Sequence, residues 1–191
     1  MGCMIGVVFV FVTLLSWFSP DVSACSCFPT HPQTIFCQNS FALVGVILKR
    51  TPTGQKNIKY TVRVVKRIKG NIGKVGSEFE FKTPSTGASC GVSYTIGTMQ
   101  FLMGRSQSNG NTIKICNMFF PKTFENWVYL LTRGRNSYIQ NCKCKVLEEG
   151  DASSPMSCRL SNNSKSCFLK TAICRRKQGG KCEWKNDEQC S

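Results

Sequence analysis

The chain opens with an apolar run over residues 5–18, which leads into the small residues Val-Ser-Ala at positions 22–24. An apolar stretch followed by a small-residue site is the pattern of a cleaved secretory signal peptide. The run is shorter than the roughly 20 residues that a membrane-spanning helix requires. We therefore expect residues 1–24 to be a signal peptide. We expect the mature protein to begin at Cys25, to be secreted and to lack a membrane span.

Residues 41–116 carry the hydrophobic pattern of short β-strands. Residues 41–49 are almost continuously apolar, as in a strand that is covered on both faces. Residues 59–69 alternate between apolar and mostly basic positions, as in a half-buried strand, and a turn signal at residues 51–54 separates the two. Six short strands at this spacing predict a mainly β domain, either a small antiparallel barrel or a sandwich, and periodicity does not distinguish the two. The six candidate strands cover residues 41–49, 59–69, 78–82, 90–96, 99–103 and 112–116.

The pattern changes twice after residue 116. Pro121 is followed by apolar residues at positions 124, 127, 128 and 131, which is the spacing of a short amphipathic helix. Residues 143–191 are polar and contain six cysteines, so this segment is expected to depend on disulfides for stability. We expect an N-terminal domain over residues 25–142 and a small disulfide-rich C-terminal domain over residues 143–191. The second contains one N-glycosylation sequon, at Asn162.

Cysteine and histidine content limits the chemistry of the chain. Only Cys3 of the 13 cysteines lies within the expected signal peptide, so an even set would remain, as in a disulfide framework. The chain has one histidine, and secretion oxidises unpaired thiols, which disfavours both thiol-bound metal and a cysteine nucleophile. No Ser-His-Asp set is readable. The composition therefore favours a protein that is not an enzyme and has no cofactor of its own, while the pairing of its cysteines stays open.

The chain is strongly basic, with a net charge of +15. In the extracellular space a basic surface suits polyanions such as sulfated glycosaminoglycans, or acidic protein surfaces, although solubility alone would also explain it. A secreted chain without a recognition motif is not expected to bind nucleic acid. The candidate polyanion-binding residues, on the polar side of residues 59–69, are Lys59, Arg63, Arg67 and Lys69.

A long motif directly follows the expected signal peptide. Residues 25–37 read Cys-Ser-Cys-Phe-Pro-Thr-His-Pro-Gln-Thr-Ile-Phe-Cys and resemble the mature N-terminus of the tissue inhibitors of metalloproteinases. Residues 88–94, the cysteine doublet at residues 142–144 and residues 182–184 extend the resemblance over essentially the whole mature chain. The resemblance implies that the first domain is a six-stranded closed antiparallel barrel, an OB-fold of the netrin-like kind, with short flanking helices.

The resemblance also implies a disulfide pairing, although the second domain departs from the family pattern. A usual cysteine is absent from residues 146–155, and the chain has Cys190 near its end instead. The last pair therefore follows only by elimination. The expected pairs are Cys25–Cys90, Cys27–Cys116, Cys37–Cys142, Cys144–Cys182, Cys167–Cys174 and, by elimination, Cys158–Cys190.

For function, the resemblance implies an inhibitor that chelates the catalytic zinc of its target enzyme through the α-amine and carbonyl of Cys25. Ser26 would enter the primed-side specificity pocket, and its small size favours broad inhibition. The implied partners are matrix metalloproteinases and related zinc endopeptidases, bound by a monomer in a 1:1 complex. The remaining protease contacts would be Cys27, Phe28 and Pro29 along the cleft, and Ala88, Ser89 and Cys90 on the unprimed side.

Alternatives stay open beside this interpretation. Cys25 and Cys27 could be ordinary disulfide cysteines near an N-terminus. The chain could also be a netrin-like module that binds heparan sulfate or matrix without inhibiting a protease. In such modules the Cys-x-Cys motif follows other domains, whereas here it follows the expected signal peptide, which favours the inhibitor. His31, the single histidine, is expected to be structural rather than catalytic or a metal ligand.

Overall fold

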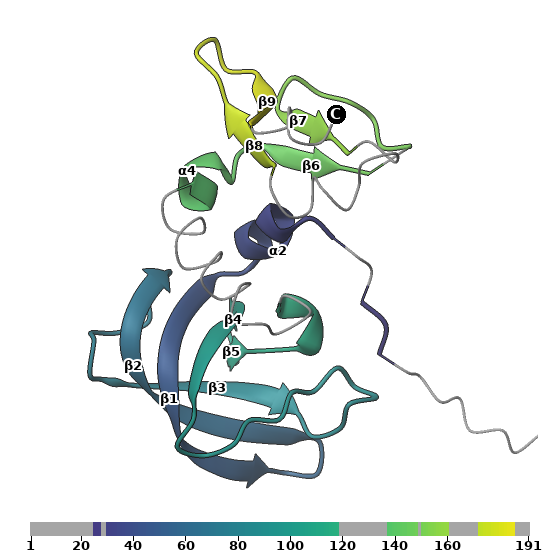
Figure 1. Cartoon of the computed structure of the whole chain (residues 1–191). Coiled ribbons are helices and arrows are strands. Elements are labelled where there is room, and N and C mark those ends of the chain that lie inside the picture. The colour runs from purple at the N-terminus through teal and green to yellow at the C-terminus, as the bar shows by residue number, and fades with distance from the viewer. Residues whose placement is uncertain (1–24, 28–29, 119–136, 149, 161–171, 186–191) are drawn as a thin grey trace, which may run out of the picture.

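The computed structural model describes residues 25–27, 30–118, 137–148, 150–160 and 172–185. Within these ranges the chain forms a β-barrel and two small sheets beyond one end of it, with the short helix α2 (Pro32–Gln38) in between (Figure 1). No helix in the described ranges is long and apolar enough to cross a membrane. Several sequence predictions fall outside them, namely the signal peptide, Phe28, Pro29, the helix near Pro121, Asn162, Cys167 and Cys190.

Five strands close the barrel, in the order β1-β2-β3-β5-β4. Neighbouring strands are antiparallel except β3 and β5, which pair in parallel through Lys82 and Thr112. The mainly β class and the closed barrel are confirmed, but the expectation of six strands, all antiparallel, is wrong. The strands are β1 (Phe41–Thr53), β2 (Asn57–Lys69), β3 (Glu78–Pro84), β4 (Met99–Gln107) and β5 (Gly110–Thr112).

The expected strand at residues 90–96 is absent for a local reason. Cys90 has a φ of 63°, in the left-handed region, which interrupts an extended strand at its first residue. Val92 and Tyr94 are buried in the barrel, but their N–H groups donate to the side-chain oxygens of Thr83 and Tyr60 rather than to another strand. The apolar alternation at these residues therefore reflects the burial of Val92 and Tyr94 in the barrel, without pairing of a strand.

Two other expected boundaries also shift. The expected strand at residues 112–116 is paired only at its start, because the chain turns into the 3₁₀ helix η1 (Ile115–Asn117). The turn expected at residues 51–54 comes later, because β1 pairs with β2 as far as Thr53.

Apolar side chains from all sides fill the barrel. The ring of Tyr60 stacks on Phe81 with centroids 5.4 Å apart, and Tyr94 meets both rings edge-on. Each fully buried large apolar side chain stabilises a fold by about 1.5–3 kcal/mol, so this interior is the main source of stability for the barrel. The interior cluster consists of Phe41, Leu43, Ile47, Ile58, Tyr60, Val62, Val64, Ile72, Phe79, Phe81, Val92, Tyr94, Leu102, Ile113 and Met118.

Helix α2 packs on the outside of the barrel; the resemblance implied short flanking helices, but the sequence pattern did not place one at these residues. At its start, Nδ1 of His31 accepts a hydrogen bond from the Gln33 N–H at 3.2 Å, and Pro32 occupies the first helical position. At its end, Nζ of Lys69 donates to the carbonyl oxygens of Phe36 and Cys37 at 2.8 and 3.0 Å. Phe36 belongs to an outer cluster that also contains Ala42, Val44, Ile68, Phe101, Met103, Tyr138 and Ile173.

The segment after the barrel forms small elements with little core of their own. A short helix, α4 (Ile139–Asn141), leads into β6 (Lys145–Leu147), which pairs in parallel with β7 (Ser157–Arg159). β8 (Ile173–Arg176) pairs with β9 (Cys182–Lys185) as an antiparallel hairpin. As far as this segment is described, one buried cluster contains Leu160 and Ala172, and the other contains Cys144, Cys158 and Cys174.

The disulfides of this segment correct two of the expected pairs. Cys144 is bonded to Cys182, as the family resemblance implies, but Cys158 is bonded to Cys174. The expected pairs Cys167–Cys174 and Cys158–Cys190 are therefore both wrong. The physical reason is that Cys158 on β7 and Cys174 on β8 lie in the same buried cluster with Cα atoms 5.8 Å apart.

Candidate functional site

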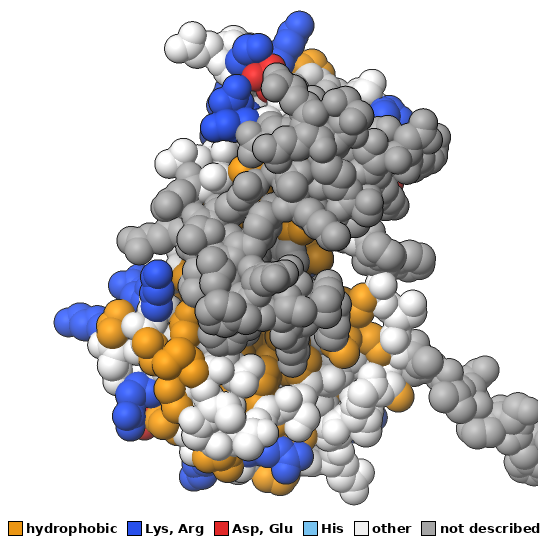
Figure 2. Space-filling view, viewed as in Figure 1, with side chains coloured by type: hydrophobic (Ala, Val, Ile, Leu, Met, Phe, Trp, Pro, Cys, Tyr) orange, Lys and Arg blue, Asp and Glu red, His pale blue; other side chains and the backbone are white. Residues whose placement is uncertain are grey.

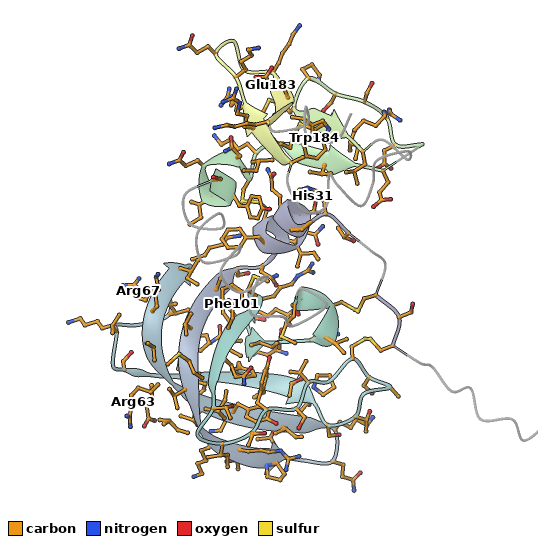
Figure 3. All side chains as sticks on the ribbon, viewed as in Figure 1. His31, Arg63, Arg67, Phe101, Glu183 and Trp184 are labelled. Carbon is orange, nitrogen blue, oxygen red and sulfur yellow. A yellow bond between two sulfur atoms is a disulfide. The ribbon has the colours of Figure 1, made fainter. Side chains whose placement is uncertain are left out.

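The first described residues are fastened to the barrel at two neighbouring points. Cys25 is bonded to Cys90 in the loop after β3, and Cys27 is bonded to Cys116 in η1. The two bridges lie side by side, because Sγ of Cys25 is 3.9 Å from Sγ of Cys116 (Figure 3). Both pairs match the expected pairing, as does the Cys37–Cys142 bridge behind them. Residues 25–27 and residues 86–90, joined in this way, are called the N-terminal edge below.

The loop that receives Cys25 is held in one conformation by its own hydrogen bonds. The Cys90 N–H donates to the Gly87 carbonyl and the Gly91 N–H donates to the Thr86 carbonyl, both at 2.9 Å. Cys90 is the one non-glycine residue with a positive φ in the described ranges, and such strain is common at functional sites. At position 91 only glycine fits, since an added Cβ would lie 2.1 Å from the Pro84 carbonyl oxygen.

The N-terminal edge is exposed although it is rigid. Ser26, Cys27, Ala88 and Ser89 are exposed to solvent, and Cys25 and Cys90 are partly buried beneath them. The Cys90 carbonyl accepts a hydrogen bond from the Ile115 N–H at 2.9 Å, which fastens the loop to η1. The arrangement therefore presents backbone groups of Cys25 and small side chains at an exposed surface.

Close cysteine sulfurs in the described residues do not form a thiolate metal site. Two groups of three lie within 4.8 Å of one another, Cys25 with Cys27 and Cys116, and Cys144 with Cys174 and Cys182. All six sulfurs are in disulfides and therefore carry no thiolate. Any metal contact of Cys25 would have to use its backbone atoms.

The His-Pro-Gln segment lies behind the edge. His31 is 1% exposed, and besides capping α2 its ring lies 5.3 Å from the ring of Trp184. This burial supports the structural role expected for His31. Sequence reasoning missed Gln33, which is also 1% exposed and is hydrogen-bonded to the segment after the barrel. A proline one residue after a capping side chain is the signal that could have revealed the helix.

Comparison with known proteins agrees with this geometry. The family model described as Tissue inhibitor of metalloproteinase matches residues 23–184, which is most of the chain. The chain belongs to this family. It is 29% identical to Metalloproteinase inhibitor 2 of Bos taurus and 28% identical to that of Homo sapiens, in each case over 90% of this chain and 86% of the relative. It is 24% identical to Tissue inhibitor of metalloproteinase of Drosophila melanogaster, over 56% of this chain and 51% of the relative.

In this member of the tissue inhibitor family, two of the four basic residues expected to bind a polyanion are engaged by other groups of the protein. Lys59 forms an ion pair with Glu80 at 3.0 Å, and its hydrogen bond lowers the pKa of that carboxyl. Lys69 is partly buried at the end of α2, where burial lowers the pKa of its amine. Arg63 and Arg67 are exposed. Figure 3 shows them on the opposite side of the barrel from the N-terminal edge, and Figure 2 shows basic side chains along that side.

Proposed function

We propose that this protein is a secreted inhibitor of zinc metalloendopeptidases that blocks its target with the N-terminal edge. The observation that carries the proposal is the pair of adjacent disulfides that fixes residues 25–27, of which Ser26 and Cys27 are exposed, to the strained loop at Cys90 and to η1 at Cys116. Family membership supports the same conclusion, because the relatives are named metalloproteinase inhibitors. Removal of residues 1–24 would give Cys25 a free α-amine.

The proposed chemistry uses the backbone of Cys25. A catalytic zinc keeps one coordination position for water or substrate. The amine nitrogen and carbonyl oxygen of Cys25 would close a five-membered ring on that zinc and displace the water. An α-amine has a pKa of about 7.7–8.0, so the metal needs only a modest pull to bind it unprotonated at neutral pH.

The neighbouring residues would occupy the substrate cleft on both sides of the zinc. Ser26 would enter the primed-side pocket, with Cys27, Phe28 and Pro29 beyond it, and Ala88, Ser89 and Cys90 would lie on the unprimed side. Because the edge is already rigid, little conformational entropy is lost on docking. The inhibitor is not cleaved, because the chain starts at the zinc and no continuous peptide crosses it. One monomer is proposed to bind one protease.

The decisive experiment adds one alanine before Cys25 in the mature protein. The amine becomes an amide, which is a poor zinc ligand, and the extra residue collides with the metal site. We expect the inhibition constant to rise by more than the roughly 10–100-fold that loss of an outer-shell metal partner costs. The melting temperature should stay unchanged, because the core and disulfides are untouched.

A protein with one alanine added at its C-terminus is the matched control, measured against the same metalloproteinase catalytic domain. Full inhibition by the N-terminally extended protein would show that zinc is not chelated by the Cys25 amine. Wild-type protein that inhibits no member of a metalloproteinase panel would overturn the proposed function as a whole.

A second function is favoured by the exposed cations of β2. Arg63, Lys66 and Arg67 are exposed on one strand, and Figure 3 shows Arg63 and Arg67 away from the N-terminal edge, so a sulfated glycosaminoglycan chain could bind there while a protease is held. Reversing Arg63 and Arg67 to glutamate should lower the salt concentration that elutes the protein from heparin and leave inhibition intact, since exposed charge contacts are screened by salt. The matched control reverses Lys181 and Lys185 on β9 and the turn before it. A larger effect of the control would move the polyanion site to that hairpin.

A further inference from the structure

Among the strands that the structure describes, β8 pairs with β9 alone, which leaves its outer edge to other partners. β8 pairs with β9 on one side, and on the other side the N–H and carbonyl of Cys174 and the N–H of Arg176 face α2 and α4. Backbone groups on a buried strand edge need partners, because an unpaired polar group away from water is costly. Here the partners are two amide side chains.

Gln33 on α2 both donates a hydrogen bond to the backbone of Cys174 and accepts one from it. Its Nε2 donates to the Cys174 carbonyl at 2.7 Å, and its Oε1 accepts from the Cys174 N–H at 3.0 Å. The same Nε2 also donates to the Asn141 carbonyl at 3.2 Å. Oδ1 of Asn141 accepts from the Arg176 N–H at 2.9 Å, one pleat further along β8. The two amides therefore take the place of a neighbouring strand.

Further contacts support the same junction. Ile173 on β8 packs in the outer cluster with Phe36 of α2, and Trp184 on β9 lies against His31 at the start of the helix. Only residues 28–30 separate His31 from Cys27, whose disulfide forms the front of the N-terminal edge. The N-terminal edge is thus anchored to the barrel by its disulfides, and α2, which follows it in the sequence, is anchored to the β8–β9 hairpin.

We propose that Gln33 is a positioning residue through which the β8–β9 hairpin orients the N-terminal edge for protease binding. The proposal rests on the proposed inhibitory function and deepens it. The hairpin contributes to inhibition without contacting zinc, because it fixes the start of α2, which follows Cys27 closely in the sequence. When this junction is broken, the edge loses preorganisation, and the complex should dissociate faster.

The test replaces Gln33 with methionine, which has a similar length and forms none of these hydrogen bonds. Gln38→Met is the matched control, because Gln38 lies on the same helix, is exposed and accepts only a 3.4 Å hydrogen bond from Arg105. We expect Gln33→Met to dissociate from a metalloproteinase catalytic domain roughly 10-fold faster than wild type, since buried hydrogen bonds are lost. The association rate per active molecule should change little, and Gln38→Met should behave as wild type.

The dissociation rate separates positioning from stability. A merely destabilised inhibitor would show a smaller active fraction but an unchanged dissociation rate. A wild-type dissociation rate for Gln33→Met would overturn the inference. Wild-type protein that inhibits no protease would instead refute the proposed function.

Amide hydrogen exchange of residues 34–38, compared with that of the barrel strands, tests the junction without a protease. Faster exchange confined to α2 and β8–β9 supports the coupling, and unchanged exchange in α2 contradicts it. If Gln33→Met does not fold, the milder Ile173→Val decides by the same two measurements.

Discussion

The barrel and the segment after it are stabilised in different ways. The barrel is closed, and its interior is a continuous apolar cluster with stacked aromatic rings. The segment after it consists of two two-stranded sheets, and such sheets are marginal in isolation. Its buried clusters are small, and the disulfides Cys144–Cys182 and Cys158–Cys174 cross them. Packing therefore maintains the barrel, whereas cross-links and contacts with α2 maintain the C-terminal sheets.

This difference explains how the proposed inhibitory surface can be both exposed and rigid. The N-terminal edge has no core of its own, but its disulfides attach it to a loop and a 3₁₀ helix of the well-packed barrel. In the described part of the chain, the C-terminal sheets are joined to it through α2. Damage to the barrel should thus abolish folding, whereas damage to the C-terminal sheets should leave a folded barrel.

We expect the largest effect on the free energy of unfolding from a matched pair of leucine-to-alanine substitutions, one in each region. Leu102→Ala removes a fully buried side chain from the barrel interior and should cost about 2–5 kcal/mol in the free energy of unfolding. Leu160→Ala removes the same atoms from a cluster in which, among the described residues, Ala172 is the other buried member, so fewer packing contacts should be lost and the cost should be smaller. Chemical denaturation followed by circular dichroism measures both.

The two variants also differ in where they act. Leu102→Ala should lower the melting temperature of the whole β signal, whereas Leu160→Ala should increase proteolysis only after residue 142. Equal losses of unfolding free energy would show that the barrel and the C-terminal sheets form one cooperative unit, contrary to the comparison above.

The sequence predicted the parts of the fold that depend on hydrophobic alternation. Four of the barrel strands were found, because their alternating residues face a continuous core. The strand expected at residues 90–96 was wrong, since burial of Val92 and Tyr94 imitates the pattern of a paired strand. Helix α2 was missed because it is only seven residues long and Phe36 is its one large fully buried apolar side chain.

The candidate site was predictable where the family motif determines it, and less so elsewhere. The disulfides of Cys25 and Cys27 follow the motif, whereas Cys158–Cys174 depends on how β7 and β8 pack, which spacing does not encode. The charge pattern of residues 59–69 could not reveal that Lys69 caps α2, because the helix itself was not predicted. Gln33 was missed because the helix that carries it was not predicted. In addition, its hydrogen-bond partners lie more than 100 residues away in the sequence.

We expect the smallest effect from surface ion pairs, and each region has a glutamate in such a pair. In the hairpin, Glu183 accepts hydrogen bonds from Lys177 at 2.8 Å and from Arg175 at 3.3 Å, and the Lys177 bond is the main cause that lowers the pKa of its carboxyl. In the barrel, Lys59 lowers the pKa of Glu80 in the same way. A carboxyl whose pKa is lower in the folded state contributes stability above its unfolded pKa and loses it as the pH falls through the folded pKa.

Acid should therefore weaken both ion pairs, but only the hairpin should respond visibly. Surface ion pairs contribute little and are screened by salt, so the core under β2 and β3 should hide the loss of the Glu80 pair. At neutral pH we expect Glu183→Gln to speed amide hydrogen exchange in residues 173–185, and Glu80→Gln to leave exchange in residues 57–69 unchanged. Lowering the pH of wild type below the carboxyl range, with exchange rates corrected for their intrinsic pH dependence, should reproduce both results. If exchange in β2 increased as much as exchange in the hairpin, the apolar interior would contribute less to the stability of the barrel than its packing implies.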